Sequence, residues 1–547
     1  MYNFNNCVFL NNIPSNEPAL SYSSGSYERK KLKAAISELK NTFTEIPLVI
    51  GGSEIKTGST KDIILPHNKN KKIGNYYLAG EKEISQAVEA ALSAAKDWSK
   101  TPFERRFLIF NKAAELLTMK YRYLINAATM LSISKNAYQA EIDAVCELSD
   151  FWRFNNYYMQ EIYRSQPLNN PRGTFNYIEY RPLEGYIFAS TPFNFASIAG
   201  NLPTAPVIMG NVALWKPASN AVFVPHLLMQ ILKEAGLPDG VINFVPSSGK
   251  TKGSFFLENK NLAGIHFTGS TEVFTDIWRL VGNNIPHYKN FPRIVGETGG
   301  KDFIFVHTSA DIDAVVTGII RGAFEYQGQK CSAASRAYIP NSIWKTLKVE
   351  LLSEISTIKI GDVEDFSNFM NAVIDEASFD KIKSYIDFSK NSKDAEILCG
   401  GGCNKETGYF IEPTVILTKD PFFKTMVEEI FGPVITVYIY DDNKFEETLD
   451  ICDKTSPYGL TGSIFANDIN AIGTALEKLS NAAGNFYVND KPTGAVVSQQ
   501  PFGGSRASGT NDKSGSYINL LKWTSARAIK EYFVPPTNYR YPFMEEK

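Results

Sequence analysis

Apolar side chains recur at the spacing of an α-helix in four parts of this chain, so that one face of each segment is apolar. The last of them stops at Gly236 and Pro238, residue types that commonly end helices. The predicted helical segments are Leu32–Leu39, Ile84–Trp98, a long stretch from Phe103 to about Tyr163, and Val222–Ala235.

Short apolar runs rich in β-branched and aromatic residues lie between helical segments in the middle of the chain. These predicted strands are Tyr186–Ser190, Val212–Trp215, Val241–Val245, Ile265–Phe267 and Phe303–Val306. Alternating strands and helices predict an α/β fold, with parallel sheets covered by helices on both faces. Such sheets bind ligands at the carboxyl ends of their strands. A second alternation runs from about residue 310 to 480.

Three segments depart from this pattern. Residues 1–30 are polar and rich in Tyr, Asn and Ser, which favours an extended arm. Gly173–Arg181 alternates and is rich in aromatic residues, as an exposed strand would be, and the tail after Asp512 ends in a Tyr- and Pro-rich stretch. The last two segments are candidate assembly elements; a surface hairpin and a frayed tail are the plainer alternative.

Length and composition narrow the class of protein. A chain of 547 residues is too long for one core, so two or three domains are expected. The formal net charge of −2 gives no sign of a nucleic-acid or anionic-membrane partner. No apolar run approaches the ~20 residues that span a bilayer. The first 28 residues hold no Lys or Arg, which argues against a signal peptide and against an Arg-rich transit peptide, while an atypical import signal stays open. A small-molecule substrate is therefore expected.

The six cysteines are scattered, which favours a reducing compartment over a disulfide framework. Cys399 and Cys403 bracket three glycines, but no second ligand pair follows, so no metal site is expected. Cys331 differs from the others because the small residues Gly328, Ser332 and Ala333 would let a ligand approach it. A nucleophilic thiol needs access, a lowered pKa and a partner that handles protons. A lone cysteine is otherwise inert packing.

Two polar residues are candidate partners of Cys331. Glu297 precedes it by 34 residues in a glycine-rich run and is suited to act as the general base that activates a water. Asn194 follows a predicted strand, and its amide, with the backbone N–H of Cys331, could stabilise an oxyanion. Taken singly, each is an ordinary turn residue.

Further candidates for a dinucleotide site follow other strands, although no G-x-G-x-x-G fingerprint is present. Lys216 is placed to hold ribose hydroxyls, and Glu429 to hold the nicotinamide ribose. Glycine at 299 lets the backbone come near a nicotinamide. The full predicted cofactor set is Lys216, Ser219, Phe267, Thr268, Gly269, Ser270, Gly299, Glu429 and Phe431.

In this order along the chain, these segments and Pro501–Gly504 resemble the aldehyde dehydrogenase superfamily. The resemblance implies a Rossmann-type NAD-binding domain, a catalytic α/β domain and a small β oligomerisation flap that pairs with a second subunit. The implied boundaries are 1–164 with 186–296 for the NAD-binding domain, 297–514 for the catalytic domain, and 165–185 with 515–547 for the flap. A homodimer or higher homo-oligomer is expected.

A narrower resemblance is to the branch of this superfamily that oxidises glutamate semialdehyde to glutamate. It is carried by Ala140–Asp143, Phe151–Asn155, Ser190–Phe195, Phe324–Ser335 and Gln500–Lys513. The run Gly503–Lys513 is especially similar. It implies a thiohemiacetal and then a thioester on Cys331. The substrate-binding residues it implies are Ser332, Gly494 and Ala495 for the carboxylate, Phe195 and Phe502 for the aliphatic stem, and, as a weaker candidate, Glu147 for the ammonium.

Several alternatives stay open. Many NAD-preferring relatives carry glutamate where this chain has Ser219, so NAD is favoured over NADP by the narrower resemblance alone. Some relatives carry serine where this chain has Ala495. A dehydrogenase for succinate semialdehyde or a simple aliphatic aldehyde, or a non-catalytic binding protein on the same scaffold, are the competing hypotheses. The mitochondrial matrix is the expected compartment by resemblance, and the cytosol is the alternative.

Overall fold

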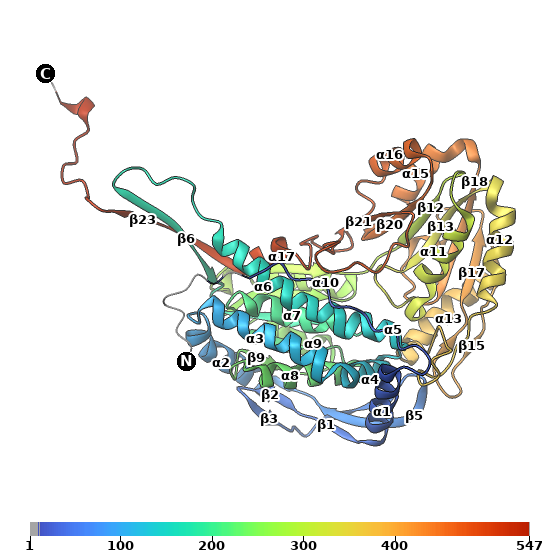
Figure 1. Cartoon of the computed structure of the whole chain (residues 1–547), viewed down its shortest axis with the longest axis horizontal. Helices are drawn as coiled ribbons and strands as arrows, with labels where there is room; N and C mark the ends of the chain where they lie inside the picture. Colours follow the sequence, from blue (N-terminus) through green and yellow to red (C-terminus); the bar gives the residue numbers. More distant parts are fainter. Residues whose placement is uncertain (1–8, 10, 546–547) are drawn as a thin grey trace.

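Two seven-stranded sheets organise the computed structural model, which describes residue 9 and residues 11–545. The first sheet and its helices fill the left and centre of Figure 1, and the second sheet lies to the right. The first has the order β11-β10-β7-β8-β9-β2-β3, and the second β14-β17-β18-β13-β12-β20-β21. Helices cover both, as the alternating pattern predicts.

The first sheet is parallel from β11 to β9, and an antiparallel hairpin, β2–β3, extends one edge. Every residue of β10 is buried, so its apolar run needs no alternation. Four of the five predicted strands belong to this sheet. Its strands are β11 (Arg293–Glu297), β10 (Leu262–Thr268), β7 (Tyr186–Ser190), β8 (Ala213–Lys216), β9 (Ile242–Phe244), β2 (Leu48–Ile50) and β3 (Ser53–Ile55).

Helices pack around this sheet, and the predicted end of α8 is confirmed, because Gly236 caps it with a φ of 102°. The long predicted helical stretch is interrupted: Ser134 takes a left-handed φ of 60° and ends α4, and the Asn136 side chain caps the next helix. The helices are α1 (Tyr27–Asn41), α2 (Glu81–Trp98), α3 (Phe103–Glu115), α4 (Arg122–Ile133), α5 (Ala137–Ala140), α6 (Leu148–Arg164), α7 (Ala196–Ile208), α8 (Phe223–Ala235), α9 (Gly249–Leu257) and α10 (Thr271–Asn284).

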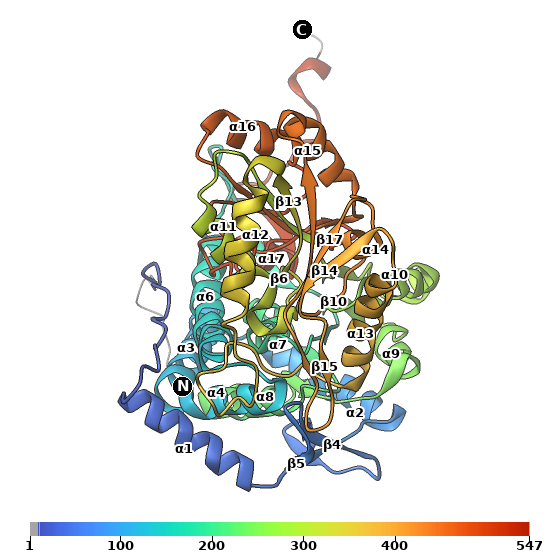
Figure 2. The same ribbon diagram turned by 90° about the vertical axis from the view of Figure 1, so that its right-hand side faces the viewer.

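The region between residues 42 and 78 contains strands that the sequence patterns do not predict. A small sheet of order β1-β5-β4 forms there, from β1 (Thr44–Ile46), β4 (Thr60–Leu65) and β5 (Asn68–Tyr77). β5 begins with a polar, lysine-rich run and has register shifts against β4, so it lacks a regular apolar alternation. α1 lies beside this sheet and packs on α4 (Figure 2).

The second sheet is parallel except for its edge strand β14. The fifth predicted strand is its β12. The strands are β12 (Asp302–Val306), β13 (Ala334–Pro340), β14 (Ala395–Cys399), β17 (Thr414–Thr418), β18 (Val434–Tyr440), β20 (Thr461–Phe465) and β21 (Asn485–Val488). The helices around it are α11 (Ile312–Phe324), α12 (Asn341–Ile355), α13 (Glu376–Lys390), α15 (Phe445–Lys454) and α16 (Ile469–Lys478).

A two-stranded ribbon projects from this body. It pairs β6 (Thr174–Pro182) antiparallel with β23 (Thr524–Tyr532), and the C-terminal tail continues beyond it (Figure 1). Residues of β6 alternate between exposed and partly buried, which confirms the predicted exposed strand. The tail beyond β23 is exposed throughout its described length. In the perpendicular view the tail again ends away from the body (Figure 2).

Candidate active site

Four predicted site residues lie where neighbouring parallel strands of the first sheet end. Lys216, Thr268 and Glu297 are the last residues of β8, β10 and β11, and Asn194 follows the end of β7. Because these four strands are adjacent in the order β11-β10-β7-β8, their carboxyl ends share one edge of the sheet. The fold therefore gathers residues that are far apart in the sequence.

Cys331 lies in a tight loop between α11 and β13. The three residues Tyr326, Gln327 and Gly328 have φ values of 52°, 55° and 66°, a left-handed run that non-glycine residues seldom adopt. The Gln327 side chain fixes this conformation, donating to the carbonyls of Ser134 (3.0 Å) and Ala372 (2.8 Å). Strained backbone held by buried hydrogen bonds is typical of a functional loop.

Asn194 reaches the same loop. Its Nδ2 donates to the carbonyl oxygen of Gln329 at 3.0 Å, two residues before Cys331. An amide nitrogen carries two N–H groups, so one remains for a substrate oxygen. Asn194 is buried, which strengthens such a donor. The structure thus places the predicted oxyanion donor beside the predicted nucleophile.

A buried ion pair that sequence analysis missed supports Asn194. Asp143 accepts hydrogen bonds from the backbone N–H groups of Ala196 (3.0 Å) and Ser197 (2.9 Å), at the start of α7. Lys135 Nζ lies 2.6 Å from Asp143 Oδ2 and 4.2 Å from the centre of the Phe195 ring. Because α7 begins directly after Asn194 and Phe195, this pair orients both of them. Lys135 lies in the loop between α4 and α5, whereas Asp143 lies in the helical segment Glu141–Glu147, so no helical spacing in the sequence reveals the pair.

Glu297 is held by the segment Gly503–Ser514, called here the clamp. Glu297 forms an isolated antiparallel bridge with Gly509. Thr510 N–H donates to the carbonyl of Gly296 at 2.9 Å, and the Gly296 N–H donates to the Thr510 hydroxyl at 3.0 Å. A Cβ at Gly509, whose φ is 131°, would lie 2.2 Å from the Gly296 oxygen. The clamp thus fixes the strand that carries the predicted base.

The environment of Cys331 contradicts the expectation of a lowered thiol pKa. Burial raises its pKa well above the usual value, and the carboxyls of Glu297, Asp302 and Glu429 raise it further. A hydrogen bond from the Ser332 backbone opposes them. Three acidic groups around one thiol disfavour the thiolate, so positive charge from a bound ligand would favour it.

Burial also raises the pKa of Glu297, to about 8. Lys513 of the clamp lowers this pKa and Asp512 raises it. Asp512 is itself paired with Lys522 at 3.0 Å. The ammonium of Lys513 donates to the carbonyl of Gly484 at 2.8 Å, so its position is fixed. A carboxyl with a pKa near neutrality suits a general base.

The predicted cofactor residues of the second sheet lie against this centre. Glu429 Oε1 accepts from the Gly300 N–H at 3.0 Å. A Cβ at Gly299 would lie 2.3 Å from Glu429 Oε2, and one at Gly300 2.2 Å from the Cys331 carbonyl. The space at these two glycines is therefore used by Glu429 and the cysteine loop, and the approach of a nicotinamide stays a prediction. Phe431 has a left-handed φ of 64°.

The other predicted cofactor residues surround the strand ends. Lys216 is partly buried, which lowers its pKa, and its ammonium forms no ion pair among the residues that the structure describes. The Thr268 hydroxyl is buried without a hydrogen-bond partner in that same part of the chain. Gly269 N–H donates to the Glu297 carbonyl at 3.2 Å. Ser219 and Ser270 are exposed, whereas the Phe267 ring is buried against Phe274.

One cavity collects Cys331 and all five residues predicted to bind the substrate: Phe195, Ser332, Gly494, Ala495 and Phe502. The Ser332 hydroxyl is 2.8 Å from the Thr493 hydroxyl. Glu147 also lines the cavity, and burial, followed by the charge of Asp143, raises its pKa to about 8. Lining residues that sequence analysis missed are Asn16, Glu17 and Ala19 of the N-terminal arm, with Arg321, Lys330 and Lys491.

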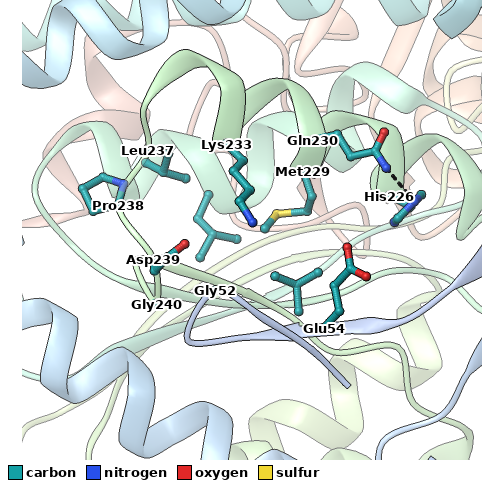
Figure 3. A pocket seen from close by; sticks show the side chains of 12 residues that line it. Gly52, Glu54, His226, Met229, Gln230, Lys233, Leu237, Pro238, Asp239 and Gly240 are labelled. Atoms are coloured by element: carbon teal, nitrogen blue, oxygen red, sulfur yellow. Dashed lines mark hydrogen bonds between the residues drawn. The ribbon is translucent and has the colours of Figure 1, made fainter. Parts of the chain in front are cut away.

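A separate hollow lies between the β2–β3 hairpin and α8 (Figure 3) and shares no lining residue with the substrate cavity. Glu54, His226 and Lys233 line it, and Gln230 hydrogen-bonds to the His226 ring at 3.0 Å. It contains none of the predicted site residues. Among the described residues, no three His, Cys, Asp or Glu side chains gather as a metal site. In that same portion of the chain, no helix is both long and apolar enough to cross a membrane.

The thiol of Cys331, in the loop before β13 of the second sheet, lies beside an amide and a carboxyl at the strand ends of the first sheet. This arrangement is suited to the oxidation of an aldehyde. A model of the aldehyde dehydrogenase family matches residues 55–529, and the chain belongs to this family. Its fold is the mixed α/β fold of that family.

Individual relatives of this chain share one name within the aldehyde dehydrogenase family. Delta-1-pyrroline-5-carboxylate dehydrogenase, mitochondrial, of Dictyostelium discoideum is 54% identical over 97% of this chain and 96% of its own length. The human protein of the same name is 47% identical over 97% of this chain and 94% of its own length. The crystal structure of delta-pyrroline-5-carboxylate dehydrogenase from Mycobacterium tuberculosis bound with NAD has a TM-score of 0.95 at 48% identity, covering 99% of this chain and 100% of that one.

Proposed function

We propose that this protein oxidises L-glutamate γ-semialdehyde, which forms when 1-pyrroline-5-carboxylate is hydrolysed, to L-glutamate, with NAD⁺ as the oxidant. This is the second step of proline degradation. The observation that carries the proposal is the single cavity in which Cys331 meets a carboxylate-binding loop, Gly494–Ala495, and two aromatic walls, Phe195 and Phe502. The sequence relatives described above are named for this substrate along nearly the full chain.

The residues at the strand ends fit a nicotinamide dinucleotide. Lys216 offers an ammonium that has no ion-pair partner among the described residues. Thr268 offers a buried hydroxyl that has no hydrogen-bond partner in that part of the chain. Glu429 is fixed by Gly300 and would hold the nicotinamide ribose. When bound, NAD⁺ takes the hydride from the substrate carbon. The solved relative from M. tuberculosis is described as bound with NAD.

In the first half-reaction, Cys331 reacts as the thiolate, its proton having passed to solvent. The sulfur forms a bond to the aldehyde carbon, and the carbonyl π electrons move to the oxygen. That oxyanion is stabilised by the second N–H of Asn194 and by the Cys331 backbone N–H. The two donors lie close together because Asn194 is hydrogen-bonded to Gln329, in the same loop as Cys331. Loss of hydride from the carbon then leaves a thioester. The rigid left-handed run before Cys331 keeps the sulfur in place.

In the second half-reaction, Glu297 accepts a proton from a water that attacks the thioester carbon. The C–S bond breaks, glutamate leaves and the Cys331 thiolate is regenerated. The clamp holds Glu297 through Gly509 and Thr510, which makes the geometry of this step reproducible. The base works only while ionised, so its pKa of about 8 sets the pH range of this step.

The assembly, compartment and domain boundaries follow as parts of this proposal. A homodimer would form through the projecting ribbon, whose exposed Phe175 and Tyr177 are 46% and 37% accessible. Relatives from amoeba to human are named mitochondrial; the mitochondrial matrix is the proposed site. The proposed boundaries are residues 1–164 and 186–296 for an NAD-binding domain, 297–514 for a catalytic domain, and 165–185 and 515–547 for the flap; the presence of two large sheets supports this division.

Substrate choice tests the proposal. Purified protein with NAD⁺ is supplied separately with 1-pyrroline-5-carboxylate, succinate semialdehyde and propanal, and NADH is followed by absorbance. The expected result is the highest kcat/KM with 1-pyrroline-5-carboxylate. A higher value with succinate semialdehyde would contradict the proposed substrate while retaining the Cys331 chemistry. NAD⁺ binding without turnover of any aldehyde would indicate a non-catalytic protein.

A further inference from the structure

Two groups of charged side chains line the substrate cavity. One comprises Asp143, Glu147 and Asp150, which come from the helical region before and within α6. Within it, Asp143 is neutralised by Lys135. The second group is mainly cationic and comes from α11, the cysteine loop and the loop after β21. Its members are Arg321, Glu325, Lys330 and Lys491.

Within the cationic group, Lys491 differs from Lys330 in having its charge free. Lys330 Nζ lies 2.9 Å from Glu325 Oε2, and both side chains are buried. The Lys491 ammonium forms no ion pair within 4.0 Å among the residues that the structure describes. Its positive charge contributes to lowering the pKa of Glu325, so it lies near that pair without joining it. Arg321 is exposed at the rim.

Lys491 also lies beside the predicted carboxylate-binding loop. A Cβ at Gly494 would be 3.1 Å from Lys491 Nζ, so the ammonium lies over that glycine. Gly494 has a left-handed φ of 93°. A left-handed residue turns successive N–H groups toward one side, which makes an anion-binding concavity with Ala495. The Lys491 ammonium and the backbone N–H groups of Gly494 and Ala495 thus present positive charge to the same part of the cavity.

We propose that Lys491 is a specificity-determining residue: its ammonium binds the carboxylate that the substrate carries at the end remote from the aldehyde, beside the N–H groups of Gly494 and Ala495. This inference deepens the proposed function and rests on it. A partly buried cation without an internal partner is stabilised by an anionic ligand and opposes an apolar one, whose binding would desolvate it. The absence of a hydroxyl at Ala495 makes the lysine charge more important.

The test compares Lys491→Met with Lys491→Arg. For Lys491→Met, the ratio of kcat/KM for glutamate semialdehyde to that for propanal should fall about 10- to 100-fold, since a charge-assisted hydrogen bond is lost. The loss should lie mainly in KM, because the contact is remote from the reacting carbon. Lys491→Arg should recover the ratio to within about fivefold of wild type. Lys345→Met, an exposed lysine of α12, is the matched control.

An inhibitor separates this inference from the proposed substrate. Glutarate, a dicarboxylate, should inhibit propanal oxidation competitively, with a Ki about 10- to 100-fold higher in Lys491→Met. An unchanged glutarate Ki, or equal losses for both aldehydes, would overturn the role of Lys491. A wild-type protein inactive on 1-pyrroline-5-carboxylate but with a glutarate Ki that depends on Lys491 would overturn the proposed substrate alone.

Discussion

At the scale of single residues, the site places acidic groups around a thiol that must ionise. Burial and the carboxyls of Glu297, Asp302 and Glu429 all raise the Cys331 pKa. Glu297 in turn has a pKa of about 8, so at neutral pH it is mostly protonated and its effect on the thiol is small. Because each negative charge disfavours the other, Glu297 and Cys331 titrate as a pair. Both groups are ionised together only at higher pH.

The pH dependence of turnover follows from the Glu297 pKa. Only the ionised carboxyl accepts a proton, so kcat should rise from pH 6 to 9 with a midpoint near 8, where the pKa lies. Steady-state kcat over pH 6–10 measures it. Glu297→Gln should lower kcat by about 10²- to 10⁴-fold and remove this limb. A flat wild-type profile, or the same limb in the variant, would speak against Glu297 as the base.

The residues proposed to act directly carry a local signal in the sequence, whereas the residues that hold them do not. Cys331, Glu297 and Asn194 stand next to small residues or strand ends, which is a local signal. Lys135 and Asp143 carry no such signal, because their role depends on contact between a loop residue, a helical residue and the start of α7. Likewise, nothing local to Lys491 indicates that its ammonium lies over Gly494.

At the scale of elements, the clamp, Gly503–Ser514, bonds to β11, the strand that ends at Glu297. Gly509→Ala should displace Gly296 and Glu297, because the new Cβ would lie 2.2 Å from the Gly296 carbonyl at a φ of 131°. A fall of about 10- to 100-fold in kcat is expected, as for other small misplacements of catalytic groups. Steady-state kinetics and thermal unfolding measure the effect.

Gly473→Ala is the matched glycine control. Gly473 lies inside α16, and a Cβ there meets no atom within 4 Å. It should leave kcat unchanged and stabilise the fold by about 0.5–1 kcal/mol, since alanine is the better helix former. If Gly509→Ala matched this control in kcat, the clamp would have no part in positioning Glu297.

Strongly periodic elements were predictable and irregular ones were not. β7, β10 and α8 follow from apolar runs and a terminal glycine. The interruption at Ser134 and the small sheet of β1, β4 and β5 were missed, because a left-handed serine and a polar edge strand with register shifts leave no periodic pattern. The sequence predicts parallel sheets as a fold class, but it does not predict the order of the strands within each sheet.

At the scale of the whole molecule, the ribbon of β6 and β23 is the feature that one chain does not explain. A two-stranded ribbon is marginally stable alone, and no third strand pairs with β6 or β23 among the described residues. Only side chains cover part of the outer edge of β6, where Gln166 bonds to the backbone of Ile178. Exposed aromatic residues continue along the tail, with Phe533 62% and Tyr541 64% accessible. Pairing with a second copy would cover such edges.

Removal of residues 524–547 tests this arrangement. The full chain should behave as a dimer or larger oligomer in light scattering, and the truncated chain as a monomer, because β23 is lost and β6 has no partner. Tyr177→Lys in the intact chain provides a second variant that keeps β23 and should weaken the same contact. A monomeric full-length protein, or an unchanged mass in both variants, would refute assembly through the ribbon.

The most direct test of the account is the identity of the covalent intermediate. Glu297→Gln is mixed with 1-pyrroline-5-carboxylate and NAD⁺, quenched in acid within one turnover, digested and analysed by mass spectrometry. We expect a glutamyl adduct on the peptide that contains Cys331, formed together with one equivalent of NADH, and no adduct in Cys331→Ala. NADH formation with no adduct, or an adduct on another cysteine such as Cys146 or Cys452, would contradict it.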